Sequence, residues 1–163
     1  MKLSTDTRVI EELLARGVER VYPSTDFLRD KLLSGERLKV YLGIDPTGPT
    51  LHAGHIVPLK KLRAFQKLGH EVVLLVGDFT ATIGAPDKLS VRVPLSTEEV
   101  LNNAKLYKEQ ASRFLSFDGE NPAVITYNSH WLREMRFADV LALASRVSVH
   151  QMIERDMFQQ RIE

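Results

Sequence analysis

Two short apolar segments on either side of one amphipathic segment constrain the fold of this chain more than any other feature of its sequence. Residues 38–44 (LKVYLGI) and 71–77 (EVVLLVG) are rich in apolar and β-preferring residues, a composition typical of strands buried on both faces. Between them, residues 53–68 place apolar side chains at three-residue intervals and basic ones on other faces, and Gly69 follows, which predicts a helix. A strand, a helix and a strand in one sheet predict parallel strands joined by a right-handed crossover.

The sequence on both sides of this unit predicts further helices and one more strand. Two amphipathic segments come first: one ends at Gly17, and the other begins at the N-cap Ser24 and ends at Gly35. The other predicted elements are a strand at 123–127, an irregular functional loop over 78–95, a helix from the capping box of Ser96 and Glu99 to about Leu115, and helices over 131–135, over 138–145 and from Ser148 to Glu163. The predicted fold class is α/β, with a Rossmann-type parallel sheet, N-terminal helices and a C-terminal helical segment.

Length and composition exclude several classes of protein. A chain of 163 residues with 44% hydrophobic and 26% charged residues has room for one domain of roughly 100–200 residues and is neither disordered nor fibrous. It has no apolar run near the ~20 residues of a membrane span, no signal-peptide pattern and no cysteine, so we expect a cytoplasmic protein without disulfides. Its net charge of +1 provides no broad field for nucleic acid, so any such contact has to be local. Because the last helical pattern has no stop signal, we expect a piece of something larger.

The segment 41–55 (YLGIDPTGPTLHAGH) is the most informative for function. It begins at the carboxyl end of the first predicted strand and ends in the first turn of the next helix, where open α/β sheets bind ligands and unpaired helix amides attract anions. Its glycines let a ligand approach the backbone, and Asp45 adds an acceptor. His52 and His55 can project from one side of the helix and donate hydrogen bonds to a phosphate. We predict that these two histidines are catalytic.

Simpler roles for the same histidines are open at this point. A His-x-x-His pair at a helix start more often caps helix amides or lies on the surface than carries chemistry. Zinc is disfavoured because it needs at least three protein ligands, and His70, His130 and His150 are scattered along a chain without cysteine, so we predict no metal site. Neither a P-loop nor a G-x-G-x-x-G motif follows a strand, which excludes the two commonest alternative phosphate-binding motifs.

Longer stretches carry a specific resemblance. The segment LHAGH (51–55) looks like the His-x-Gly-His signature of class I aminoacyl-tRNA synthetases and related nucleotidyltransferases, which bind ATP against a Rossmann helix. Residues 41–84 resemble bacterial tyrosyl-tRNA synthetases nearly end to end, and PLSTEEV, YNSHWL and SVHQMIERDMFQQRIE also resemble that family. The resemblance covers almost all of residues 1–163 and implies a partial Rossmann catalytic domain, with leading helices in 1–37, a nucleotide-binding half in 38–115, and a connective segment and candidate dimer interface in 116–163.

The resemblance implies a binding site for tyrosine. Tyr41 would place its phenol against the hydroxyl of the substrate, Gly43 would lie beside the substrate, and Thr80 would lie near it. Hydrogen bonds to the substrate hydroxyl reject phenylalanine, and tyrosyl-tRNA synthetases are a recognised example of this discrimination. Without the resemblance, Tyr41 would be interpreted as an ordinary strand residue half buried in the core.

The resemblance also implies a binding site for ATP. His52, His55, Thr47 and Gly54 would face the nucleotide, and Asp45 would lie between the nucleotide and the amino acid, among the ATP-binding residues. The implied reaction is attack of the tyrosine carboxylate on the α-phosphate of ATP, which Mg²⁺ accompanies. Pyrophosphate leaves and tyrosyl-adenylate forms, and transfer to tRNA(Tyr) follows in the full-length enzyme.

The resemblance further implies a homodimer joined through about residues 115–163. The apolar candidates for that surface are Val124, Ile125, Trp131, Leu132, Phe137 and Val140. The alternative is that these side chains form the domain's own helical cap. The basic residues of the 53–68 helix also have two interpretations, contact with an acceptor stem or, as favoured here, a solvated helix face; they are Lys60, Lys61, Arg63 and Lys67.

Three departures from the family pattern weaken the expected activity. Gly84, Ala85 and Pro86 stand where the family has Gly-Asp-Pro, so the aspartate that holds the ammonium group of tyrosine is missing. The loop is also one residue shorter than in the family pattern. Asp87 is the candidate to replace the missing carboxylate. Loss of one such charge-assisted bond costs about 1.5–3 kcal/mol, or about tenfold or more in tyrosine affinity. The chain also lacks the Lys-Met-Ser-Lys-Ser type loop, and it lacks the later tyrosine-binding helix and anticodon-binding domains.

Two other functions are weighed against this one. A small nucleotidyltransferase of the phosphopantetheine adenylyltransferase kind also begins a helix with His-x-Gly-His, but here two helices precede the strand and the second phosphate motif is missing. A non-catalytic nucleotide-binding or dimerisation module is favoured by Ala85 and by the missing loop. We expect the chain to bind ATP or tyrosine weakly and to have little adenylation activity alone.

Overall fold

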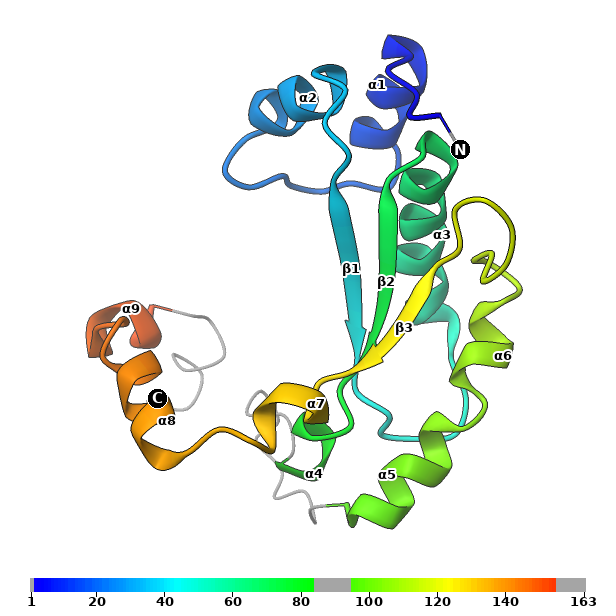
Figure 1. The fold of residues 1–163 in the computed structure, drawn as a ribbon. Helices are drawn as coiled ribbons and strands as arrows, with labels where there is room; N and C mark the ends of the chain where they lie inside the picture. Colours follow the sequence, from blue (N-terminus) through cyan, green and yellow to red (C-terminus); the bar gives the residue numbers. More distant parts are fainter. Residues whose placement is uncertain (1, 84–94, 155–163) are drawn as a thin grey trace.

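Three parallel strands form the centre of the part of the chain that the structure describes (Figure 1). In the computed structural model, which describes residues 2–83 and 95–154, the strands are β1 (Lys39–Ile44), β2 (Glu71–Val76) and β3 (Val124–Tyr127), in that spatial order. Both neighbouring pairs are parallel, so the carboxyl ends of all three strands lie at one edge of the sheet. The predicted α/β class and the parallel sheet are confirmed, and each strand lies within one residue of its predicted bounds.

The two faces of the sheet are covered unequally, which corrects the expectation that strands are buried on both faces. The central strand β2 is largely buried along its whole length. In β1, burial alternates: Lys39, Tyr41 and Gly43 are exposed, and the residues between them are more buried. Because Tyr41 keeps 69% of its surface exposed, it is not the half-buried core residue that its strand position alone suggests.

One long helix connects β1 to β2 and packs against both strands. This helix, α3 (Ala53–Leu68), has the bounds that the sequence predicts, and it places Leu62 and Phe65 in the hydrophobic core. Gly69 ends the helix with φ of 97°, a left-handed conformation that favours glycine. A Cβ at Gly69 would also lie only 3.0 Å from the Cα atom of Leu3, so the N-terminal segment packs closely over the helix end.

Two helices precede the sheet and lie at the end where the strands begin (Figure 1). The first, α1 (Thr7–Ala15), begins at the N-cap Asp6, and the second, α2 (Thr25–Leu33), begins at the predicted N-cap Ser24. The two helices contact each other, and α1 also contacts α3. Their buried residues extend the core; these are Ile10, Leu13, Leu14 and Leu32. The predicted pair of leading helices is therefore confirmed.

The loop predicted after β2 contains a short helix, α4 (Thr80–Ile83), which the sequence pattern misses. It starts where the carbonyl of Gly77 accepts a hydrogen bond from the amide of Ala81 at 2.9 Å. The pattern misses it because so short a helix has no apolar periodicity to detect. The expectations for Ala85 and Asp87 lie outside the described residues.

The single helix predicted from Ser96 to about Leu115 is in fact two, α5 (Thr97–Ala104) and α6 (Tyr107–Ala111). The first helix ends where the amide of Lys105 bonds to the carbonyl of Asn102, three residues back instead of four.

The capping box at the start of α5 is confirmed. Ser96 Oγ accepts from the amide of Glu99 at 3.2 Å, and the Glu99 carboxylate accepts from the amide of Ser96 at 2.8 Å. Hydrogen bonds from the side chain and the amide of Ser96 hold the pKa of Glu99 below its usual value.

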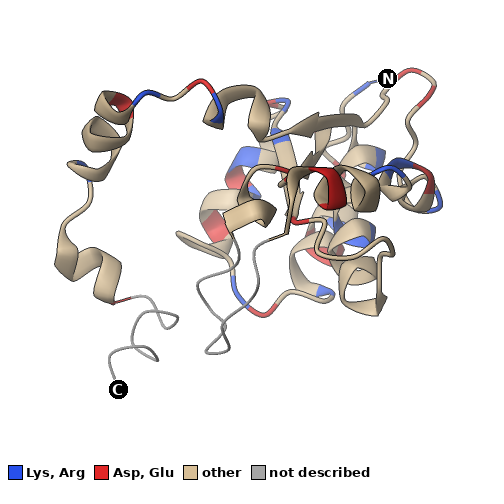
Figure 2. Cartoon of the chain, turned by 90° about the horizontal axis from the view of Figure 1, so that it is seen from below, with Lys and Arg blue, Asp and Glu red and all other residues tan. Residues whose placement is uncertain are grey.

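Between β3 and residue 154, the structure describes the helices α7 (Ser129–Leu132), α8 (Phe137–Ala144) and α9 (Val149–Ile153). Figure 1 shows α8 and α9 leading away from the sheet, and Figure 2 shows few charged positions along them. Because α8 buries none of its residues and Phe137 keeps 76% of its surface exposed, the helical-cap alternative is wrong for α8. The helix predicted to continue from Ser148 is described only as far as Ile153. None of the helices in the described ranges has the length and apolar character needed to cross a bilayer.

A buried polar cluster joins the end of α3 to the start of β1 and to the turn before β3. Gln66 donates from Nε2 to the backbone oxygens of Ser116 and Asn121, at 2.6 and 2.9 Å. Asn121 donates from Nδ2 to the backbone oxygens of Gln66 and His70, both at 3.0 Å. His70 accepts from the amide of Leu38 at Nδ1 (3.2 Å), whereas its buried Nε2 has no partner within the described part of the chain. This cluster holds together three segments that lie far apart in sequence.

We expect acid to destabilise the fold through His70. Burial, and then the nearby Arg37, lowers the pKa of His70, so below about pH 6.5 the unfolded chain binds a proton that the folded chain does not. This contribution to the free energy of unfolding is present above about pH 6.5 and is lost as the pH falls toward the lowered pKa. Urea unfolding at about pH 7.5 and about pH 5.5 measures the effect. His70→Asn keeps an acceptor for Leu38 but does not titrate, so it should lose less stability on acidification than the wild type, whereas the exposed His130→Asn should behave like the wild type. An equal acid loss in His70→Asn would contradict the assignment.

Candidate active site

Side-chain hydrogen bonds tie the ends of the three strands together at the carboxyl edge of the sheet. Thr80, after β2, donates from Oγ1 to Oδ1 of Asp45, after β1, at 2.7 Å. Asn128, after β3, donates from Nδ2 to Oγ1 of Thr80 at 2.9 Å, and its Oδ1 accepts from the amide of Phe79 at 2.9 Å. Two predicted site residues, Asp45 and Thr80, are therefore in direct contact. Asn128 is not among the predicted site residues, although it lies directly after a strand and within the YNSHWL stretch that resembles the family.

Gly77, the residue after β2, makes this contact possible. A Cβ at Gly77 would lie 1.8 Å from Oδ1 of Asp45 and 2.6 Å from Oγ1 of Thr80. Gly77 also donates its amide to the carbonyl of Ile44 at 2.9 Å, which extends the pairing of β1 with β2. Close approach therefore requires glycine here. The sequence does not reveal this requirement, because Gly77 looks like the end of an apolar strand.

His52 and His55 lie side by side at the start of α3. Their ring centroids are 3.9 Å apart. The Nδ1 atom of His52 accepts from the amide of Gly54, and the Nδ1 atom of His55 accepts from the amide of His52, both at 3.1 Å. The simpler role of capping helix amides is therefore real, but it does not exclude chemistry. A neutral ring that accepts at Nδ1 carries its hydrogen at Nε2, so each histidine also presents an N–H donor.

The surroundings of the two rings favour this arrangement. Burial, and then the neighbouring His52, lowers the pKa of His55, which favours the neutral ring whose Nδ1 lone pair the cap requires. Gly54 leaves room for the His52 ring, because a Cβ at Gly54 would lie 2.9 Å from Cε1 of His52. The glycine expected to let ATP approach therefore also makes room for the neighbouring histidine.

The other predicted site residues lie around this edge without joining the two groups. Tyr41 and Gly43 share the open face of β1, and a Cβ at Gly43 would meet nothing within 4 Å. Thr47 is exposed and donates its amide to the carbonyl of Asp45 at 2.8 Å. Among the described residues, no hydrogen bond joins Tyr41 or the two histidines to the pair of Asp45 and Thr80.

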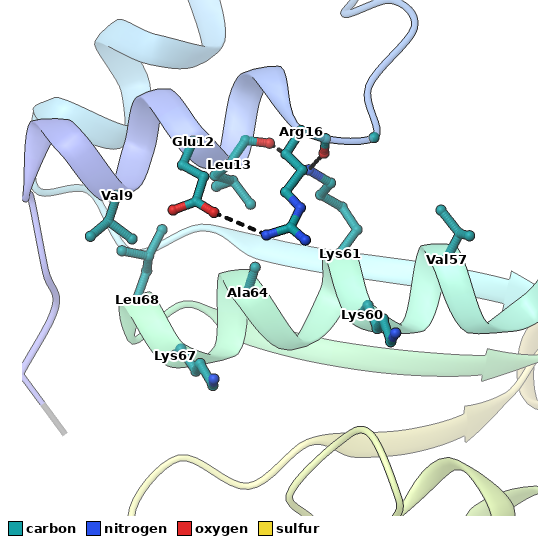
Figure 3. A pocket seen from close by; sticks show the side chains of 11 residues that line it. Val9, Glu12, Leu13, Arg16, Val57, Lys60, Lys61, Ala64, Lys67 and Leu68 are labelled. Carbon is teal, nitrogen blue, oxygen red and sulfur yellow. Dashed lines mark hydrogen bonds and ion pairs between the residues drawn. The ribbon is translucent and has the colours of Figure 1, made fainter.

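A groove of about 490 Å³ lies between α1 and α3, but none of the predicted site residues lines it (Figure 3). At this groove Lys61 donates from Nζ to the carbonyls of Leu13 and Arg16, at 2.5 and 2.6 Å, and so caps the end of α1. Burial, and then Arg16, lowers the pKa of Lys61. Lys61 is therefore neither free to contact an acceptor stem nor part of a solvated helix face, because its ammonium group is bonded to the end of α1. Lys60 and Lys67 are exposed, as a solvated helix face requires.

A dedicated metal site does not fit the described residues. Within 2–83 and 95–154, no three His, Asp or Glu side chains are grouped so that they could hold a metal ion. The carboxylates at the sheet edge have other partners: Asp45 accepts from Thr80, and Asp78 Oδ1 accepts from the amide of Ser129 at 2.9 Å.

Comparison with known proteins decides the family. The family model described as "tRNA synthetases class I (W and Y)" matches residues 33–163. The chain belongs to this family. The chain is similar to the tyrosine–tRNA ligase of Moorella thermoacetica, with 48% identity over 155 residues. It is also similar to the tyrosine–tRNA ligase of Carboxydothermus hydrogenoformans, with 46% identity over 158 residues. Each comparison covers 93% of this chain but only 37% of the relative, so the chain spans little more than a third of their length.

A solved structure confirms the Rossmann-type fold of the class I synthetase chain. The C-terminally truncated mitochondrial tyrosyl-tRNA synthetase of Aspergillus nidulans has the same fold, with a TM-score of 0.79 at 24% identity, over 94% of this chain and 47% of that one. The family assignment also excludes the small nucleotidyltransferase of the phosphopantetheine adenylyltransferase kind.

We expect Gly77→Ala to destabilise this class I synthetase chain by about 2 kcal/mol, because the new Cβ would overlap the Thr80–Asp45 contact and overpacking typically costs 1–3 kcal/mol. Gly43→Ala is the matched control, since it adds the same methyl group two residues before Asp45 in open space. It should change the free energy of unfolding by less than about 1 kcal/mol. Urea denaturation measures both variants, and equal stability of the two would contradict the role given to Gly77.

Proposed function

We propose that this chain is the tyrosine- and ATP-binding part of a tyrosine–tRNA ligase. The observation that carries the proposal is the paired His52 and His55 at the start of α3, beside the carboxyl edge where Asp45 contacts Thr80. It is supported by 48% identity to a tyrosine–tRNA ligase across nearly the whole chain. Residues 1–37 supply the leading helices and residues 38–115 the nucleotide-binding half. Transfer to tRNA(Tyr) is proposed for a full-length enzyme.

The proposed first step is formation of tyrosyl-adenylate. A carboxylate oxygen of tyrosine attacks the α-phosphorus of ATP, and the new oxygen–phosphorus bond forms as the bond to pyrophosphate breaks. The Nε2–H groups of His52 and His55 donate hydrogen bonds to phosphate oxygens as negative charge develops on them, so their contribution is electrostatic. Thr47 and Gly54 lie on the segment that faces the nucleotide. Mg²⁺ arrives bound to the phosphates of ATP, since the described side chains offer no cage for it.

Recognition of tyrosine is proposed for the open face of β1. The exposed phenol of Tyr41 is available to bond to the substrate hydroxyl, and the open space at Gly43 leaves room for the substrate ring. Asp45 lies two residues further along the same strand end, between this face and the ATP side. Thr80 fixes its carboxylate through Oδ1.

We also propose that residues 116–163 contain a surface for a second copy of the chain. Phe137 and Val140 of α8 are exposed, as are Val124 and Trp131. Ile125 is not part of the proposed dimer surface, because it packs against the domain's own core. The cytoplasmic location expected from the sequence stays a prediction.

Tyrosine-dependent exchange of pyrophosphate into ATP tests the proposed activity. We expect slow exchange in the wild type, and at least tenfold less in both His52→Ala and His52→Asn, because both remove the Nε2–H donor. Asparagine is a good N-cap that preserves the bond from the Gly54 amide, so His52→Asn should unfold at the same urea concentration as the wild type, unlike His52→Ala. Wild-type exchange in His52→Asn would contradict the role of His52. ATP binding without exchange in the wild type would favour the non-catalytic module.

Sedimentation tests the proposed dimer. We expect the wild-type chain to associate into dimers as its concentration rises, and Phe137→Asp to remain monomeric, because a charge would be buried at the centre of an apolar contact. The control is Val9→Asp, which changes another exposed apolar residue, on α1 and far from α8 in Figure 1. A wild type that stays monomeric at all concentrations would contradict the proposal.

A further inference from the structure

Gln110 of α6 holds the loop that leads from β1 to His52. Its Nε2 donates to the carbonyl of Pro49 at 2.9 Å, and its Oε1 accepts from the amide of Leu51 at 2.7 Å. One side chain therefore fixes two points of the loop 46–51, and the second point is the residue directly before His52. The amide of His52 is in turn bonded to the ring of His55. A shift of Leu51 would therefore move the backbone of His52 and, through this bond, the ring of His55.

Two neighbours of Gln110 hold the same loop. Tyr107 donates its hydroxyl to the carbonyl of Gly48 at 2.7 Å, and Asn103 donates from Nδ2 to the carbonyl of Pro46 at 3.0 Å. Tyr107 is almost fully buried, and burial raises its pKa, so its hydroxyl stays protonated as a donor. Although α5 and α6 are separate helices, all three side chains face the loop, since each is bonded to it.

The loop depends on such partners for a chemical reason. Pro46 and Pro49 have no amide hydrogen, so the segment cannot be held by a regular backbone ladder. Its carbonyl oxygens would also repel a phosphate group if they turned toward it. Bonds from side chains direct the carbonyls of residues 46, 48 and 49 toward α5 and α6 instead.

We propose that Gln110, assisted by Tyr107 and Asn103, is a positioning residue that sets the two histidines for the phosphates of ATP. The proposal rests on the proposed function for its ligand. No sequence motif points to these three residues. They lie more than 50 positions beyond the loop, and only the folded chain brings them to it.

The test is carried out on the chain of 163 residues with Gln110→Met, which keeps the length of the side chain but loses both bonds. We expect the imidazole ¹⁵N resonances of His52 and His55 to shift, the Leu51 amide to exchange with solvent about tenfold faster, and the Kd for ATP to rise about tenfold. Tyr107→Phe removes one bond without changing the ring and should give the same changes to a smaller extent. The control Glu109→Gln, at an exposed position on the same helix, should change none of them.

The outcomes separate the positioning role from the proposed function. If Gln110→Met is less stable but keeps wild-type imidazole resonances, Leu51 exchange and ATP affinity well below its unfolding temperature, Gln110 is merely structural and the inference is wrong. If the wild type does not bind ATP, the proposed function is wrong. The resonances and the Leu51 exchange still decide the positioning role in that case, because neither needs a ligand.

Discussion

The hydrogen bond from Thr80 to Asp45 is the contact on which the organisation of the carboxyl edge depends. The Thr80 hydroxyl donates to the carboxylate, which accepts, and the same hydroxyl accepts from the Nδ2 atom of Asn128. Asp45, Thr80 and Asn128 follow β1, β2 and β3, which lie in that order in the sheet. The hydrogen bonds therefore connect the ends of neighbouring strands. The bond from Thr80 to Asp45 forms only because Gly77 has no side chain. The bond uses Oδ1 of Asp45 and so also fixes the direction in which Oδ2 points.

A second set of bonds reaches the same edge from outside the sheet. Two of the six residues in the loop 46–51 are prolines without an amide hydrogen, and side chains of α5 and α6 supply partners for the loop. The break between these two helices does not disturb that arrangement, since Asn103 before it and Gln110 after it still reach the same loop. Strand ends, loop and helix start are thus held by side chains that come from across the described chain.

Local signals in the sequence predict most of the elements but few of these contacts. The bounds of α3 are predicted at both ends because a periodic apolar face and a C-terminal glycine are both local signals. The split of α5 from α6 and the open face of β1 are not predicted, because they depend on what packs against each segment. His52 and His55 are predicted from a motif, Asp45 from its place at a strand end, and Thr80 from the family resemblance alone. Gly77 and Asn128 lie within stretches that resemble the family, but their roles at this edge follow from distances between strand ends, which local signals do not record.

The start of α3 shows why capping and chemistry are not alternatives for this pair of histidines. A helix start needs acceptors for its amides, and an imidazole provides one at Nδ1 only while the ring is neutral. The same choice of tautomer places a hydrogen on Nε2, on the opposite side of the ring, where a donor for phosphate is needed. Protonation of His55 would remove the acceptor of the His52 amide and so loosen both rings together. Burial lowers the pKa of His55 and so maintains the neutral form. The feature that builds the helix end therefore also leaves an N–H donor on the outer side of each ring.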